Sequence, residues 1–461
     1  MANSLPPDID QKILWQLIIL SFLTRDKTGK TMFNNIIKNP GWKVTFAGTG
    51  INLALGVLYT WSIYQAKIVE SIETGIGGFD WDRASVGDPY AVACLAFAFT
   101  MILAGKCQDR LGPRLTAMIG GVLVGAGLLV ISQSTGYLAW VLGFGVLTGA
   151  GIGFGYASAT PPALKWFPGG QTGLIAGLVV AGFGLAPVYI APLASYLVQA
   201  WGLQSAMLFF AIAFFVVVSA LSQCLKNPPE GYVPEEHSDP DEAHKNMTPV
   251  ATATAVEVDM PASEMIRTSA FWKLWFLYFI GAGAGLMVIG SVAGMAKASM
   301  GNAAFIAVAI MAVGNASGRI IAGVVSDALG KRKALAIFLA LQSLNMFLAM
   351  FVVGSEGAMA FFIVLSATFI GFNYGTNLAL FPTFCKNWWG IKSLGVNYGL
   401  LFTSWGIGGF VMTRISGMIV ASTGSYMMSF ALAGLLLAVA AFMALKLETP
   451  EHLMSANKAS E

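Results

Sequence analysis

Arg319 stands out because it is a charged residue inside a long apolar stretch. Asp327 marks the end of that stretch eight positions on, so at about 1.5 Å per helical residue Arg319 lies roughly 12 Å inside the membrane. The stretch 302–325 contains no acid to pair with it. A charge at that depth is costly, and a guanidinium binds a carboxylate through two parallel N–H donors. Arg319 therefore predicts a binding site for a small organic anion; the alternative is an arginine that bonds backbone carbonyls or extends to the membrane surface.

Polar and aromatic residues in the same and other apolar stretches are candidates to complete such a site. Asn315 lies one helical turn before Arg319 and shares its face. Tyrosine and asparagine can hydrogen-bond a carboxylate, and tryptophan can form an apolar wall. The other candidates come from four further stretches and are Tyr59, Trp61, Tyr156, Asn373, Tyr398 and Trp405. Each aromatic residue has an alternative role in ordinary packing or in an interfacial belt.

The elements that must position these residues are membrane-spanning helices. Hydrophobic residues make up 56% of the chain and charged residues 11%, which is unlike a soluble globular protein. A helix needs about 20 apolar residues to cross a bilayer, and twelve such stretches are present. They lie at approximately 44–66, 86–106, 115–134, 137–160, 172–197, 204–224, 270–296, 302–325, 333–354, 357–382, 394–418 and 425–445. The chain is predicted to be an all-α membrane protein with twelve transmembrane helices.

A polar segment divides these stretches into two sets of six. We expect an N-terminal segment at 1–42, a six-helix half at 43–224, a linker at 225–268, a second half at 269–446 and a tail at 447–461. Residues 13–20 are apolar but too short to span, and are expected to form an amphipathic helix on the membrane surface. The linker is rich in acids and proline and is expected to be flexible.

Two short sequences recur at the same separation in both halves. GKCQDRLGPR at 105–114 is repeated as GVVSDALGKR at 323–332, and GFGY at 153–156 is repeated as GFNY at 371–374. We expect the first pair to act as conformational latches formed by Gly105, Asp109, Arg110, Arg114, Gly323, Asp327 and Arg332. Gly105 would allow two helices to approach closely, and Asp109 would stabilise a helix N-terminus and accept from arginine. Because Ala328 replaces Arg110, the second latch is expected to be weaker; the alternative is a set of solvated charges.

Basic residues concentrate on one side of the predicted bundle. The turns at 105–114 and 326–333 each carry three bases, whereas the 67–85 connection on the opposite side carries Glu70, Glu73, Asp80 and Asp82. By the positive-inside rule, both termini are expected to be cytoplasmic, in a plasma or inner membrane. The same helix arithmetic places Asp88 and Arg414 at the outer interface.

The repeated turns resemble the signature loop of the major facilitator superfamily, G-x-x-x-D-R-x-G-x-R/K. Four further stretches are similar to the oxalate/formate antiporter family within it: LYTWS at 58–62, KWFP at 165–168 with Gly173 and Leu174, NASGR at 315–319 and NYG at 397–399. The resemblance covers about 43–446. It implies two halves that rock about a central site to give alternating access, and it assigns Arg319 to the family's substrate-binding arginine.

The chain departs from that family's oxalate carriers at one position. These have a second base, a lysine eight residues after the asparagine of Asn-Tyr-Gly, and here that position is Trp405. One buried cation suits a monoanion, because burying a second, uncompensated carboxylate is costly. The resemblance thus implies a monocarboxylate such as formate, lactate or pyruvate rather than oxalate. No membrane carboxylate is evident near mid-depth, so symport with a proton and antiport without one both stay open.

Three other classes of function were weighed against a carrier of monocarboxylates. An exporter of drugs or other metabolites is suggested by GFGLAP at 182–187, and a transporter-like sensor by the acidic linker. An enzyme is not expected, since no nucleophile–base pair or phosphate loop is present. No cofactor and no metal is expected, and the four cysteines are expected to be reduced. The net charge of +3 is too small to indicate nucleic acid. The expected partners are a small organic anion, the lipid bilayer and, as a coupling ion, protons.

Overall fold

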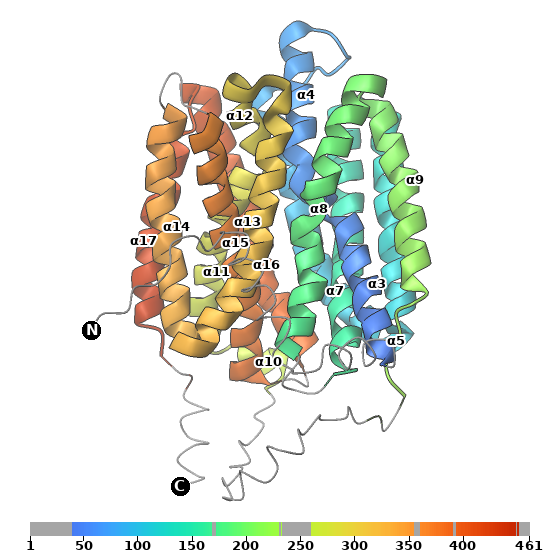
Figure 1. The fold of residues 1–461 in the computed structure, drawn as a ribbon, viewed down its shortest axis with the longest axis vertical. Helices are drawn as coiled ribbons and strands as arrows, with labels where there is room; N and C mark the ends of the chain where they lie inside the picture. Colours follow the sequence, from blue (N-terminus) through green and yellow to red (C-terminus); the bar gives the residue numbers. More distant parts are fainter. Residues whose placement is uncertain are drawn as a thin grey trace, which may run out of the picture.

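The structure is a computed structural model that describes residues 39–167, 172–229, 232, 260–354, 360–390, 393–448 and 450. Within these residues every regular element is helical (Figure 1). The predicted surface helix at 13–20 and most of the 225–268 linker and of the tail lie outside the described residues.

The first half of the chain crosses the bundle six times. The crossings are α3 (Pro40–Leu55) continued by η1 (Gly56–Thr60) and α4 (Trp61–Thr74); α5 (Asp88–Ser132), which holds two; α6 (Tyr137–Trp140) continued by η3 (Val141–Thr148) and α7 (Gly149–Leu164); α8 (Thr172–Trp201); and α9 (Leu203–Ser222). A short helix, η2 (Arg83–Ser85), lies in the connection after α4.

The second half repeats this arrangement. Its crossings are α11 (Ser269–Ile289), α13 (Phe305–Leu329), α14 (Lys331–Gly354), α15 (Ala360–Trp389), α16 (Leu394–Thr423) and α17 (Met427–Leu445). Three short helices lie between crossings or before them: α10 (Ala262–Met265), α12 (Val292–Met300) and η5 (Gly301–Ala304).

Eleven of these crossings are long and apolar enough to span a membrane, among the residues described. The remaining crossing is α16, which has 30 residues but buries polar side chains such as Thr403, Ser404 and Ser416. It packs inside the bundle against α5 and α11, so protein rather than lipid surrounds these groups. The prediction of an all-α membrane fold is confirmed.

The second glycine of each repeated turn reverses the chain between two crossings. Gly112 has φ of 80° within α5, and Gly330 has φ of 83° between α13 and α14. Only glycine adopts this left-handed region without a steric penalty, which explains why both copies keep a glycine there. The close helix approach expected at Gly105 is not found, because a Cβ there would meet no heavy atom within 4 Å, and Gly323 is equally open.

The two halves lie side by side, the first blue to green and the second yellow to red (Figure 1). They meet mainly through α5 against α16 and α8 against α13. We call the end of the bundle that carries α12 and the top of α4 the upper end, and the end that carries α10 the lower end, as drawn in Figure 1.

Candidate functional site

Arg319 lies near the middle of α13, at the contact between the two halves. Its side chain is only 4% exposed. Nε donates to Oδ1 of Asn315 at 3.1 Å, one turn earlier on the same helix. Nη1 donates to the backbone oxygen of Val180 on α8 at 2.6 Å, across the contact between the halves. Two of the three guanidinium nitrogens are therefore used to orient the group.

The third nitrogen, Nη2 of Arg319, has no hydrogen-bond partner among the described residues although it is buried. Among the residues that the structure describes, none of the ion pairs involves Arg319. Buried polar groups are nearly always hydrogen-bonded, and burial of an uncompensated charge is costly. An open cationic donor at this depth is what an anionic ligand would satisfy.

The α8 backbone passes directly beside the guanidinium at Gly184. A Cβ at this position would lie 3.4 Å from Nε and Cζ of Arg319 and 3.5 Å from Nη2. A larger side chain would therefore occupy the space around the open nitrogen. Gly184 keeps one face of the guanidinium uncovered.

Three aromatic side chains form a hydrogen-bonded chain across the halves near Arg319. The hydroxyl oxygens of Tyr59 in η1 and Tyr374 in α15 are 2.5 Å apart. Nε1 of Trp405 in α16 donates to the Tyr374 hydroxyl at 2.8 Å. Since Tyr374 accepts from Trp405, it can donate its own proton to Tyr59, which leaves the Tyr59 O–H free to donate to a ligand.

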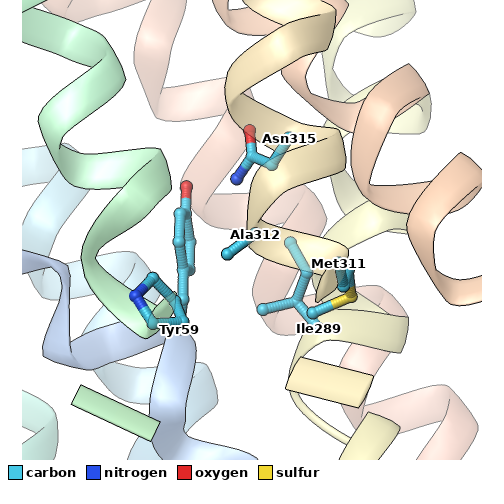
Figure 2. Close-up of a pocket in the computed structure, with 6 residues that line it drawn as sticks. Tyr59, Ile289, Met311, Ala312 and Asn315 are labelled. Atoms are coloured by element: carbon cyan, nitrogen blue, oxygen red, sulfur yellow. The ribbon is translucent and has the colours of Figure 1, made fainter. Parts of the chain in front are cut away.

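A small cavity of about 10 Å³ lies between η1, α8, α11 and α13 in this region, lined by Tyr59, Pro187, Ile289, Met311, Ala312 and Asn315. The Tyr59 ring and the Asn315 amide approach it from opposite halves (Figure 2). A volume of about 10–15 Å³ holds a single water molecule. The halves must therefore separate slightly before an organic molecule can enter.

Further aromatic rings surround this centre. Phe97 of α5 packs edge-on against Trp405 and Tyr156, with ring centroids 5.0 and 5.4 Å apart. Phe402 stacks on Trp405 at 4.7 Å. Tyr156 and Tyr398 pack against Phe402, with ring centroids 6.2 and 5.6 Å apart. The site is thus one cation enclosed by aromatic walls with hydroxyl tips.

The structure brings most, but not all, of the predicted site residues together. Arg319, Asn315, Tyr59 and Trp405 are joined to this centre by hydrogen bonds or line its cavity, and Tyr156 and Tyr398 pack against the surrounding rings. Asn373 instead donates to the Phe369 oxygen of its own helix. Trp61 packs against Phe144 and Trp140 in a separate aromatic cluster of the first half, with ring centroids 4.6 and 6.0 Å away.

Val180 and Gly184 are parts of the site that the sequence did not indicate, and Tyr374, which the same apolar stretch offers beside Asn373, was not singled out as a ligand. Tyr374 is adjacent to Asn373, and consecutive residues on a helix point about 100° apart, so the sequence does not say which of the two faces Arg319. The Val180 contribution is a backbone oxygen, which no residue type signals. For Gly184 the only signal is the GFGLAP string, which by itself suggests an exporter.

The latch residues are only partly described. The side chains of Asp109 and Asp327 lie outside the described set, and Arg110 and Arg114 are exposed. Arg332 donates from Nη1 to the Leu447 oxygen after α17 at 3.2 Å. This bond fixes the turn to the neighbouring crossing within the second half.

Among the residues that the structure describes, two ion pairs join the halves at the upper end. Arg414 of α16 pairs with Asp88 of α5, which also accepts from the Tyr137 hydroxyl at 2.6 Å. Lys297 of α12 pairs with Glu70 of α4 at 2.9 Å. The rise per helical residue predicted the same membrane depth for Asp88 and Arg414. Depth alone does not say which helices are neighbours, so the pairing of these two residues was not predicted.

Two six-crossing halves that meet at a buried, incompletely bonded arginine define a multi-pass membrane protein of the carrier type. A family model described as the Major Facilitator Superfamily matches residues 44–385, with a second match at 293–461. The chain belongs to this superfamily, as the repeated turns indicated.

Relatives within the superfamily share about a quarter of their residues with this chain. An uncharacterized MFS-type transporter of Escherichia coli, YhjX, is 26% identical over 79% of this chain and 85% of its own length. The oxalate:formate antiporter of Oxalobacter formigenes is 25% identical over 76% of this chain and 77% of its own length. Apicoplast pyruvate carrier 1 of Toxoplasma gondii is 23% identical over 78% and 80%.

Proposed function

We propose that the protein carries a small monocarboxylate across the membrane and that Arg319 holds the carboxylate. The observation that carries this proposal is the open, buried Nη2 beside two nitrogens that are already bonded. A cargo carboxylate would supply the missing acceptor and the missing negative charge. The names of the relatives, which include an oxalate:formate antiporter and a pyruvate carrier, support the class of cargo.

A monoanion fits the site better than a dianion because the second cation of the oxalate carriers is replaced. Trp405 is fully buried, and its indole N–H donates to the Tyr374 hydroxyl. Its ring stacks on Phe402, so this wall is apolar towards a ligand. A second carboxylate against this wall would be left without a counter-charge.

The neighbouring hydroxyl and amide groups would orient the cargo. The Tyr59 hydroxyl would donate a hydrogen bond to the second carboxylate oxygen. Asn315 would act through Arg319, because its side-chain oxygen accepts from Nε and orients the guanidinium. Tyr156 and Tyr398 would supply further hydroxyl donors, and Trp405 an apolar wall. Asn373 and Trp61 stay candidates of a second rank, because the hydrogen bond of Asn373 and the ring contacts of Trp61 are with their own half of the molecule.

Alternating access would follow from the contacts that cross the centre. The Arg319–Val180 and Tyr59–Tyr374 hydrogen bonds join the halves in this conformation. A carboxylate on the open Nη2 of Arg319 and on the Tyr59 hydroxyl would bind beside these two contacts, and a small shift of either side chain would weaken them and let the halves rock about the site. Exchange of one anion for another would be antiport, and carriage of the anion together with a proton would be symport. The proposed site is compatible with both.

We further propose that the lower end faces the cytoplasm of a cell with this protein in its plasma membrane. The basic turns at 105–114 and 326–333 lie at this end, as the positive-inside rule requires. Both termini and the 225–268 linker would then be cytoplasmic, and the halves would be 43–224 and 269–446. The upper end, with its ion pairs, would face outward.

Counterflow in proteoliposomes tests this function. Vesicles are preloaded in turn with formate, lactate, pyruvate, acetate and oxalate, and wild type is compared with Arg319→Ala. We expect exchange of at least one monocarboxylate, little exchange of oxalate, and no exchange by Arg319→Ala at equal protein density. Normal exchange by Arg319→Ala would refute the site, and wild type that exchanges none of these acids would refute the function.

A further inference from the structure

A second, larger cavity opens between the halves at the upper end of the bundle. It has a volume of about 340 Å³. Its polar lining consists of Lys67 and Glu70 from α4, Ser195 and Gln199 from α8, and Lys297 from α12, and the remaining lining is apolar or glycine. This volume accommodates a small organic acid, whereas the central cavity does not.

One carboxylate is shared by two lysines in this cavity. Oε1 of Glu70 is 2.8 Å from Nζ of Lys67, and Oε2 is 2.9 Å from Nζ of Lys297. The three side chains sum to one positive charge. Each ammonium has three N–H donors. In these hydrogen bonds each lysine uses one donor, which points to Glu70. The cavity is therefore already shaped to hold a carboxylate and has capacity for another.

We propose that this cavity is an outer recruiting site for the carried monocarboxylate, which binds Lys67 and Lys297 in competition with Glu70. This inference rests on the proposed function and on the outward orientation of the upper end. Both lysines and Glu70 are nearly half exposed, and such ion pairs are weak, so an incoming carboxylate can replace Glu70 reversibly.

The position of the cavity connects it to the central site. Lys67 follows Tyr59 by eight residues along η1 and α4, which is roughly 12 Å. Lys297 belongs to the second half and Glu70 to the first, so their ion pair ties the halves together at the upper end. An anion that takes the place of Glu70 on Lys297 would loosen this tie where the cargo must pass.

Variants that break the same ion pair from opposite sides test the proposal. Glu70→Gln removes the competing carboxylate, whereas Lys297→Gln removes a cation that the cargo needs. KM for the carried monocarboxylate is measured in right-side-out and in inside-out membrane vesicles, at low and high ionic strength. Arg83→Gln is the matched control, since Arg83 pairs with Glu73 at the same end but does not line the cavity.

In right-side-out vesicles we expect Lys297→Gln to raise KM about fivefold and Glu70→Gln to lower it about threefold, as electrostatic recruitment predicts. Lys67→Gln should follow Lys297→Gln. These shifts should shrink at high salt and be absent in inside-out vesicles. Arg83→Gln should leave KM unchanged on both sides.

Shifts of the same sign in Glu70→Gln and Lys297→Gln would overturn the proposal, because they would mean that the pair is only a clasp between the halves. An Arg83→Gln effect as large as that of Lys297→Gln would overturn it too, in favour of general surface charge. Failure of the proposed function has a different signature: wild type would exchange no monocarboxylate, or exchange would not depend on Arg319.

Discussion

Arg319→Lys is the sharpest test of the central site, because it keeps the positive charge and removes the planar guanidinium with its three nitrogens. The arginine uses Nε for Asn315, Nη1 for Val180 and leaves Nη2 open. A lysine has one nitrogen, which cannot reach three acceptors that surround a planar guanidinium. We expect the variant to lose at least one charge-assisted hydrogen bond to the cargo.

The size of this loss follows from the energy of such a bond. A hydrogen bond to a charged group contributes about 1.5–3 kcal/mol. At about 1.4 kcal/mol per factor of ten, KM should rise roughly 10- to 150-fold. The maximal rate should change less, because charge compensation at the centre is retained.

The assay is initial-rate counterflow in proteoliposomes over a wide range of external monocarboxylate. Arg83→Lys serves as the control, since Arg83 is exposed and remote from Arg319. Asn315→Leu should reproduce part of the effect by freeing Nε, and it should do so without changing the charge. A KM for Arg319→Lys within twofold of wild type would refute the assignment of separate tasks to the three nitrogens.

Three further predictions concern the aromatic wall, the central hydrogen bonds and the linker. Trp405→Lys should restore a second cation and move the preference in competition assays towards oxalate; an unchanged profile would remove the reason for excluding dianions. Tyr374→Phe should destabilise the protein by about 2 kcal/mol, at about 1 kcal/mol for each of two buried hydrogen bonds. Thermal melting in detergent should show that Tyr374→Phe and Trp405→Phe together cost less than the sum of the two, and strict additivity would contradict the bond between them. Deletion of 233–259 should leave uptake intact, whereas loss of uptake with normal insertion would favour a sensor that signals through the linker.

The sequence was sufficient for the architecture because membrane helices are set by composition and length. Even α16, the most polar crossing, was predicted as a span, and the depth of Arg319 followed from its distance to Asp327. The glycines of the repeated turns were found as a pattern. The sequence did not indicate that Gly112 and Gly330 would adopt a positive φ. It predicted a close helix approach at Gly105, where the structure has open space.

What could not be predicted is how each helix is rotated and which helices are neighbours. Tyr374 rather than Asn373 bonds to the central chain, because a rotation of about 100° separates adjacent residues. Trp61 shares a crossing with Tyr59 but belongs to a different aromatic cluster for the same reason. The ion pair of Asp88 with Arg414 depends on two helices from different halves, and no local pattern encodes it.

The duplicated halves have kept their tyrosines but not their charge. Tyr156 and Tyr374 end the repeated GFGY and GFNY sequences, and both side chains are buried. Arg319 itself precedes Gly323 by four positions, and the residue that precedes Gly105 by four is Met101, an uncharged side chain that is buried. The central cation is therefore contributed by the second half alone, whereas the first half contributes a tyrosine hydroxyl and a backbone oxygen, so the two halves would act unequally on a bound anion.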